Sequence, residues 1–546
     1  MLNHEINPVH SAGDLDITSL VILMIIASIV SVLVKKIRIP YTVALVLVGL
    51  VLGFLNALEP IILTEHIVLF IFLPALLFEA SWNLDLRHLK NSISSVTILA
   101  SVGVAISIAV IGFCLNYFLA LPWMISLLFG AIIAPTDPVS VVAIMKKMHL
   151  DHRISALVEA ESLFNDGTSV VFFKLLLALL MSYGLSVPQE VIGLYLSNGL
   201  IQFCLVVIGG ASLGAVIGLC FSVITKYFDD HTLELTFTTI VAYGSFLLAE
   251  SIAVPGEIHG LHLSGVVATV AAGLVMGNYG RQTGMSASTK IVVSSFWEYA
   301  AFFMNSLIFL LIGLEVQIGS LVANWFPILI AIFAVLVSRA VSVYFLAGFG
   351  NLTKLAKLPF AWQNVLVMSG LKGALSMALV LSIPRNLIAT ETRELLILMI
   401  FGVVLFTLIP QGLMISFLLK VLNIAEIISP ELTKHQFIKA QLKTAKAALS
   451  TLFTLQNEGE VMTPVALELR KELEDEIEVH YQELEKLHIS NEMIILEDKI
   501  ETKTQLLKQR KALIEDFVLN GSLSQEASME LRTQYDAELE KLQDEY

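Results

Sequence analysis

Three polar side chains that could bind a cation lie in the stretch ESLFNDGTSVVFF, residues 161–173, inside an almost wholly apolar run. Ser162, Asn165 and Asp166 are separated by three and four residues, so on a helix they share one face. Their hydroxyl, amide and carboxylate can all offer oxygen ligands, which hard cations prefer. A carboxylate in the middle of a membrane helix costs roughly 2.5–3.5 kcal/mol on insertion scales. A bound cation or proton must offset that cost.

A helix break is predicted at mid-depth of the fifth apolar run, in GAIIAPTDPVSVVAI, residues 130–144. Pro135 and Pro138 each remove a backbone donor, and two such losses three residues apart should unwind the helix. Thr136 and Asp137 lie between them. We expect Asp137 to neutralise the positive N-terminal ends of the half-helices at this break.

A second break is predicted in MSGLKGALSMALV, residues 368–380, where Gly370 and Gly373 flank Lys372. We expect Lys372 to face the negative, C-terminal ends of half-helices at the other break. Breaks at corresponding positions of two halves are typical of inverted-repeat transporters, whose site lies where the breaks meet. The first six and the last six of the thirteen predicted spans would form the two repeats.

Glu161 and Arg339 are predicted to form an ion pair within the membrane. Arg339, in LVSRAVSVY, is the only arginine in the interior of any predicted span, and such a residue needs a carboxylate partner. Glu161 points away from the helix face that carries Asp166, so we expect it to be that partner and to have a structural role.

The composition indicates an all-α polytopic membrane protein. The chain has 546 residues, of which 56% are hydrophobic and 15% charged, and its mean hydropathy is +0.81. The N-terminal residues show no basic region and no cleavage site, so the first apolar run is expected to be a retained span. No basic patch for nucleic acid and no hydrolase, nucleotide or metal-cluster motif is found, so we expect neither an enzyme nor a cofactor. The three cysteines are expected to be buried, inert thiols.

The apolar runs also predict a topology. A span takes about 20 residues. If the N-terminus lies outside, the predicted inner loops carry thirteen Lys and Arg and the outer loops two, Arg385 and Arg393, which places the tail in the cytoplasm. A plasma membrane is expected because no targeting segment is found. The thirteen predicted spans are 17–35, 41–58, 62–81, 93–119, 122–146, 153–183, 195–226, 232–253, 260–278, 294–318, 323–349, 358–383 and 393–422.

The chain is predicted to contain a transmembrane domain over residues 1–425 and a cytoplasmic helical tail over 426–546. Residues 431–546 carry 14 Lys and Arg against 24 Asp and Glu, so the tail supplies −10 of the net charge of −14. Apolar residues recur at spacings of three and four from Ala466 to Leu487, which predicts a coiled-coil-like helix. We expect the tail to regulate the membrane domain and to contribute a dimer contact.

One buried carboxylate is sufficient for an obligatory exchange. Burial disfavours the charged form, so Asp166 would hold a proton when no metal is present and ionise when a cation replaces the proton. Alternating access would then carry the loaded site past the midplane. Because Asn165 beside it is neutral, one charge would move each way and transport would be electroneutral.

Six motifs carry a resemblance to a known family. ESLFNDGTSVVFF, APTDPVSV, FLPALLFEAS, LIGLEV, SRAVSVY and GLKGALSMAL together resemble the NhaP-type sodium/proton exchangers, the electroneutral branch of the monovalent cation/proton antiporters, and they occur in family order over residues 17–422. The resemblance implies a homodimer in the lipid membrane, with a mobile core domain that contains two crossed, discontinuous helices.

The resemblance also implies roles for particular residues. Asp166 would bind Na⁺ or a proton, and Glu161 with Arg339 would be the structural pair. Asp137 and Lys372 would sit at the helix breaks, although many members have Arg where this chain has Lys372. The residues that would coordinate the ion or orient its ligands are Asn165, Ser162, Thr136 and Glu79.

Three alternatives remain open at this stage. The residues do not separate Na⁺ from Li⁺ or K⁺, so a K⁺/H⁺ antiporter of the same fold is one of them. A cation channel gated by the tail is disfavoured, because no run of carbonyl-presenting small residues forms a filter. A membrane-anchored interaction protein would leave the intramembrane charges unexplained. Affinity, pH set-point and physiological direction are not encoded in these motifs.

Overall fold

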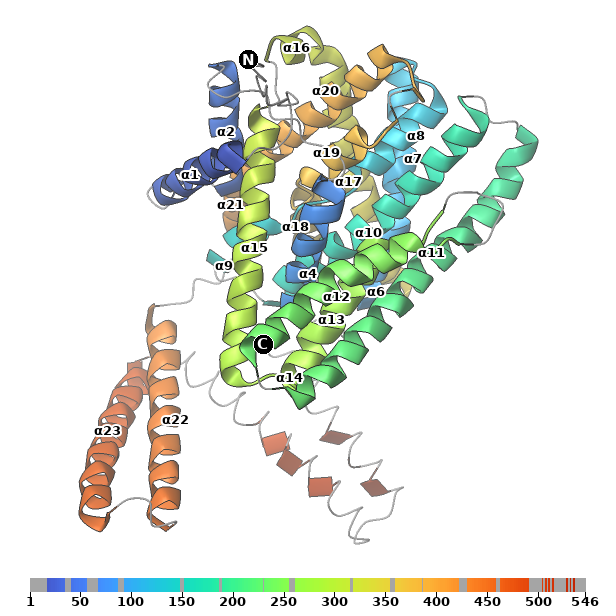
Figure 1. The fold of residues 1–546 in the computed structure, drawn as a ribbon. Helices are drawn as coiled ribbons and strands as arrows, with labels where there is room; N and C mark the ends of the chain where they lie inside the picture. The colour runs from blue at the N-terminus through green and yellow to red at the C-terminus, as the bar shows by residue number, and fades with distance from the viewer. Residues whose placement is uncertain are drawn as a thin grey trace, which may run out of the picture. The chain divides into compact units, whose positions relative to one another are not determined.

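The structure of the protein is a computed structural model. It describes residues 17–34, 41–55, 67–86, 93–147, 152–185, 189–228, 230–254, 261–314, 318–353, 359–384, 386–421, 430–457 and 462–490, with short isolated segments between 503 and 535. Within this part of the chain the elements are helices, apart from an isolated antiparallel bridge between Ala253 and His262. The chain divides into two compact units, Met1–Glu426 and Ile427–Tyr546 (Figure 1).

The helices of the first unit form two groups by their contacts. In the first group, called the frame helices, α15 packs on α2 and α4, and α13 packs on α4, α11 and α12. The frame helices and their connecting turns are α1 (Ile17–Val34), α2 (Tyr41–Phe54), η1 (Val68–Phe72), α4 (Leu73–Asn83), α11 (Gln189–Ile224), η3 (Thr225–Tyr227), α12 (His231–Ser251), α13 (Gly265–Val275), η4 (Met276–Gly280), α14 (Arg281–Thr283) and α15 (Ala287–Leu314).

In the second group, called the core helices, α7 packs on α8 and α17, and α19 packs on α8 and α20. Its members are α6 (Ile93–Ile98), η2 (Leu99–Gly103), α7 (Val104–Leu119), α8 (Trp123–Ile133), α9 (Val139–Lys147), α10 (His152–Tyr183), α16 (Ile318–Ala323), α17 (Trp325–Thr353), α18 (Phe360–Met368), α19 (Ala374–Leu381), α20 (Thr390–Phe406), η5 (Thr407–Gln411) and α21 (Gly412–Val421). Helix α10 joins the two groups, because it contacts α8 in its own group and α11 and α13 among the frame helices.

Seven helices of the described chain are long and apolar enough to cross a membrane. Four shorter apolar helices accompany them, Leu20–Val34, Tyr41–Phe54, Val68–Asn83 and Trp123–Ile133. The predicted count of thirteen spans stays a prediction. A span that is broken into two half-helices does not reach the length of a crossing helix in either half.

Both predicted helix breaks are present. Helix α8 ends at Ile133 and α9 begins at Val139, while α18 ends at Met368 and α19 begins at Ala374. The two breaks touch, because the backbone N–H of Asp137 donates to the carbonyl of Leu371 over 2.8 Å. Gly373 is required at this crossing, since a Cβ there would lie 2.8 Å from the Cβ of Asp137.

The second unit contains two long helices, α22 (Pro430–Asn457) and α23 (Thr463–Ser490), which pack side by side (Figure 1). Lys446 lies over the ring of Tyr481 at 4.6 Å, and Arg470 lies over that of Phe453 at 5.0 Å, so cation–π contacts join the pair. Most of the predicted tail beyond Ser490 lies outside the described residues.

Glycines at a spacing of four let α11 approach α13 closely. A Cβ at Gly214 would lie 2.0 Å from the carbonyl oxygen of Ala268, and Gly210 and Gly218 make similar approaches to Ser264 and Ala272. Such small-residue contacts are the usual means of tight helix packing in membranes, where no hydrophobic effect drives association.

Gly214→Ala should therefore force α11 away from α13. We expect it to lower the apparent melting temperature by several degrees, because overpacking costs about 1–3 kcal/mol. Gly199→Ala is the matched control on the same helix, since nothing lies within 4 Å of a Cβ there. Thermal unfolding followed by size-exclusion chromatography checks this, and equal melting temperatures for the two variants would contradict it.

Candidate cation-binding site

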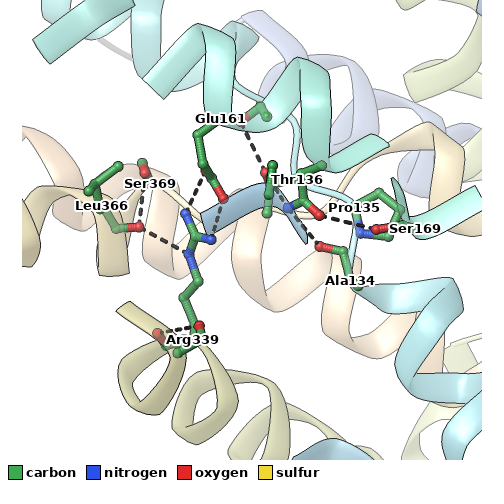
Figure 2. A network of polar contacts seen from close by, with 12 residues as sticks. Ala134, Pro135, Thr136, Glu161, Ser169, Arg339, Leu366 and Ser369 are labelled. Carbon is green, nitrogen blue, oxygen red and sulfur yellow. Dashed lines mark hydrogen bonds and ion pairs between the residues drawn. The ribbon is translucent and has the colours of Figure 1, made fainter. Parts of the chain in front are cut away.

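A chain of hydrogen bonds between polar groups joins α10 to the break between α8 and α9. The hydroxyls of Thr136 and Ser162 lie 3.0 Å apart, and the Asn165 amide donates to the Thr136 hydroxyl over 3.4 Å and to the Ala134 carbonyl over 3.3 Å. The hydroxyl of Ser169 in turn donates to the Asn165 amide oxygen over 3.1 Å. Figure 2 shows this network beside the unwound backbone. The side chains that the spacing placed on one helix face therefore meet the first break.

Asp166 lies beside this network and is half-buried on the wall of a cavity. Its charged neighbours are Asp137, Glu161 and Lys372, and the backbone N–H of Thr136 is within reach of its carboxylate. Because Glu161 is paired with Arg339, the five charged groups here are three carboxylates and two cations, which leaves one negative charge without a counter-charge. A proton or a metal cation can supply it.

Asp137 and Lys372 form hydrogen bonds at opposite kinds of helix end, an N-terminus and a C-terminus. The Asp137 carboxylate accepts a hydrogen bond from the Val139 N–H over 3.0 Å, at the positive N-terminus of α9. The ammonium of Lys372 donates to the carbonyls of Ala134 and Pro135 over 3.0 and 3.2 Å, where α8 has ended and its carbonyls have lost their helical partners. Asp137 thus lies at the N-terminus of a half-helix of its own break, whereas Lys372 reaches across to the C-terminal end of α8 at the first break.

Glu161 and Arg339 form a two-pronged ion pair between α10 and α17. The guanidinium donates to the two carboxylate oxygens over 2.7 and 2.8 Å, and its Nε donates to the carbonyl of Leu366 over 3.1 Å (Figure 2). Glu161 is 1% exposed and Arg339 is 12% exposed. Arg339 therefore ties α10 to the last turn of the broken helix α18.

A cavity of about 610 Å³ leads from the surface to Asp166. It reaches the surface at exposed Asn83 and Glu298, near the end of α4 and on α15, so it lies between frame and core helices. Its lining includes five carboxylates and no lysine or arginine among the described residues. These acids are Glu79, Asp137, Glu159, Asp166 and Glu298. A passage of this charge attracts cations and repels anions.

Glu79, to which the family resemblance assigned a part in ion coordination, lies on the cavity wall and accepts a hydrogen bond from Asn83 over 2.7 Å. The sequence analysis did not assign Glu298 to the cavity. An acid near the start of an otherwise apolar span was the available signal, but the packing of α15 on α2 and α4, which sets the position of Glu298, is not encoded locally.

Comparison with known proteins identifies the family. The sequence matches the family model described as "Sodium/hydrogen exchanger, transmembrane" over residues 21–421. The chain belongs to the sodium/hydrogen exchanger family. It is thus a multi-pass membrane transporter and not an enzyme, and in this family Na⁺ and H⁺ are transported substrates rather than cofactors.

Other sodium/hydrogen exchangers are similar over much of their length. The chain is 43% identical to the Na⁺/H⁺ antiporter ApNhaP of Aphanothece halophytica over 378 residues, which cover 69% of this chain and 68% of the relative. It is 34% identical to the Na⁺/H⁺ antiporter NhaG of Bacillus atrophaeus, with 92% of each chain covered. The solved structure of a sodium proton antiporter from Methanocaldococcus jannaschii shares the fold, with a TM-score of 0.62, 23% identity, and coverage of 74% of this chain and 98% of that one.

Proposed function

We propose that the protein is an electroneutral Na⁺(Li⁺)/H⁺ antiporter that works by alternating access, with the cation and the proton competing for Asp166. The observation that supports this most is the position of Asp166. It lies at the end of an acidic cavity, beside the polar network at two crossed helix breaks. The relatives named as Na⁺/H⁺ antiporters support Na⁺ as the cation.

The oxygens around Asp166 favour a hard cation. In this proposal Asp166 provides the charge, and the neighbouring oxygens replace part of the hydration shell of Na⁺. Asn165 holds the unwound backbone through its bond to the Ala134 carbonyl, so it also keeps those oxygens in place. The residues proposed to coordinate the ion or orient its ligands are Asn165, Ser162, Thr136 and Glu79.

Transport is electroneutral in this proposal because a single carboxylate exchanges one proton for one Na⁺. Asp166 is neutral when protonated and neutral again with one Na⁺ bound, so both crossings move no net charge. Lys372 and Asp137 are engaged with backbone groups at the helix ends, and Glu161 is engaged with Arg339. In our proposal these groups keep their charge throughout the cycle.

The broader architecture is proposed on the same basis. The thirteen predicted spans would form two inverted repeats in a plasma membrane, with the N-terminus outside and residues 426–546 as a cytoplasmic tail that regulates transport and steadies a homodimer. The cavity lies toward the C-terminal end of α4 and the N-terminal end of α10. In the predicted orientation it would open to the cytoplasm, so the structure would be inward-open.

Proton movement in proteoliposomes tests the proposal. Purified protein is reconstituted with an enclosed pH-sensitive dye, and Na⁺, Li⁺ or K⁺ is added outside with the membrane potential clamped or free. We expect Na⁺ and Li⁺ to drive proton efflux that saturates with concentration. The rate should be the same in both potential regimes, because each cycle moves no net charge.

Each of the other possible outcomes of this experiment would indicate a different transport mechanism. A rate that rises when the potential is clamped would show an electrogenic cycle, with a second group, such as Lys372, releasing a proton. A response to K⁺ equal to that to Na⁺ would show a K⁺/H⁺ exchanger of the same fold. Single-channel currents would show a channel, and no proton movement with any of the three ions would refute cation/proton exchange.

A further inference from the structure

The frame and core helices are in contact at the end of the molecule opposite the cavity. Immediately after Asp166, helix α10 packs against α13, since a Cβ at Gly167 would lie 2.9 Å from the side chain of Val267. The cavity lining includes Asp166 but no later residue of α10. The contact with α13 therefore begins where the cavity ends.

An apolar layer continues this contact along α10. Val171 and Leu175 are buried with Val206 of α11 and with Leu261, which precedes α13. The rings of Phe172 and Phe203, on α10 and α11, have centroids 4.8 Å apart. These apolar side chains pack α10 against α11 on the C-terminal side of Asp166.

An ion pair lies next to this apolar layer. The ammonium of Lys174 on α10 lies 2.7 Å from both carboxylate oxygens of Glu250 on α12. Glu250 also accepts a hydrogen bond from the Gly265 N–H over 3.1 Å, at the N-terminus of α13. The pair thus joins a core helix to two frame helices.

This pair differs from the Glu161–Arg339 pair in ways that bear on its role. Lys174 is 29% exposed and Glu250 is 18% exposed, whereas Glu161 is 1% exposed. A partly exposed ion pair contributes little net energy and can break reversibly, while breaking a buried pair is costly. The Glu161–Arg339 pair also lies wholly among core helices, so a movement of core against frame would leave it intact.

We propose that the Lys174–Glu250 ion pair acts as a latch. It holds closed the end of the molecule opposite the cavity, which we call the closed end. In this inference, which rests on the proposed exchange by alternating access, the pair and the apolar layer hold α10 against α11–α13 while the cavity is open. Opening the site to the other side requires that they separate. Lys174 and Glu250 are then positioning residues that set the populations of the two conformations and do not bind the transported ion.

Cysteine labelling of the two ends tests the latch. Cys114 is buried as expected, but the expectation was wrong for Cys204 and Cys220, which are exposed on α11. All three are therefore replaced by serine, and one reporter cysteine is introduced in each protein. Leu76→Cys reports on the cavity, and Val266→Cys reports on the closed end, where Val266 is 1% exposed. Protein in nanodiscs is treated with a water-soluble maleimide, and the labelling rates are measured.

Removing the latch should move the two rates in opposite directions. We expect Lys174→Met to raise labelling at Val266→Cys by about three- to tenfold and to lower it at Leu76→Cys, because a contact of this kind biases the populations by about that factor. Glu250→Gln should act in the same direction while it keeps an acceptor for the Gly265 N–H.

Two matched variants should leave both labelling rates unchanged. Lys174→Arg retains the charge, and Tyr344→Phe removes a 2.6 Å hydrogen bond to Asn364 that joins two core helices only. Unchanged rates in Lys174→Met, or an equal rise at both reporters, would overturn the latch.

Proton movement is recorded separately with wild-type protein. Exchange without a labelling shift would refute the latch alone, and a labelling shift without exchange would support the latch and refute the proposed function.

Discussion

Replacing Asp166 by asparagine is expected to reduce Na⁺-driven proton movement and proton-driven Na⁺ movement to the background of empty liposomes. The substitution removes the charge that binds the cation and the group that binds the proton. A unit charge at about 4 Å contributes about 4 kcal/mol at an effective dielectric constant of 20. That corresponds to roughly a thousandfold loss of cation affinity.

The folded protein should tolerate the substitution. Asparagine has nearly the same shape as aspartate and removes the repulsion from Asp137, while Lys372 keeps the Ala134 and Pro135 carbonyls as acceptors. We therefore expect Asp166→Asn to keep or raise the apparent melting temperature while transport is lost. Thermal unfolding and dye-monitored exchange on the same preparation separate loss of function from loss of fold.

Glu298→Gln is the matched control for Asp166→Asn. It removes one carboxylate from the same cavity, but from an exposed position on α15. It should raise the half-saturating Na⁺ concentration by only a few-fold, and only at low ionic strength, because salt screens exposed charges. Coupled exchange that persists in Asp166→Asn would assign the proton to another acid of the cavity, with Asp137 as the next candidate.

The local parts of the site could be predicted from the sequence because local chemistry determines them. Pro135 and Pro138 cannot continue a helical ladder, and Gly373 lacks the Cβ that would collide with Asp137 where the two breaks meet. Both breaks therefore fall where these residues are. The pairing of Glu161 with Arg339 followed from a different constraint, since an arginine inside a span needs an acid at the same depth.

The remaining contacts depend on how distant helices pack, which no local pattern encodes. Lys174 and Glu250 are 76 residues apart in sequence, and several other acids lie closer to Lys174 along the chain. The cavity position of Glu298 depends on the contact of α15 with α2 and α4. The number of complete spans is also not settled by hydropathy, because a broken span and a short helix give similar apolar runs.

Removing one member of the Glu161–Arg339 pair is expected to be the most destabilising change in the membrane unit. Arg339→Met leaves Glu161, at 1% exposure, without its counter-charge, and it leaves the Leu366 carbonyl without the guanidinium donor. Breaking a buried pair in this way costs about 3–5 kcal/mol. Glu161→Met should cost a similar amount, and both variants should unfold at much lower temperatures than the wild type.

The double variant Glu161→Met with Arg339→Met distinguishes a structural pair from a transport pair. No charge is left buried alone, so its loss of stability should be far smaller than the sum of the two single losses. If the pair only ties α10 to α17 and α18, the double variant should also retain Na⁺/H⁺ exchange. Additive losses of stability would show that the two charges do not stabilise one another. A stable double variant without exchange would instead assign the pair a part in ion movement, together with Asp166.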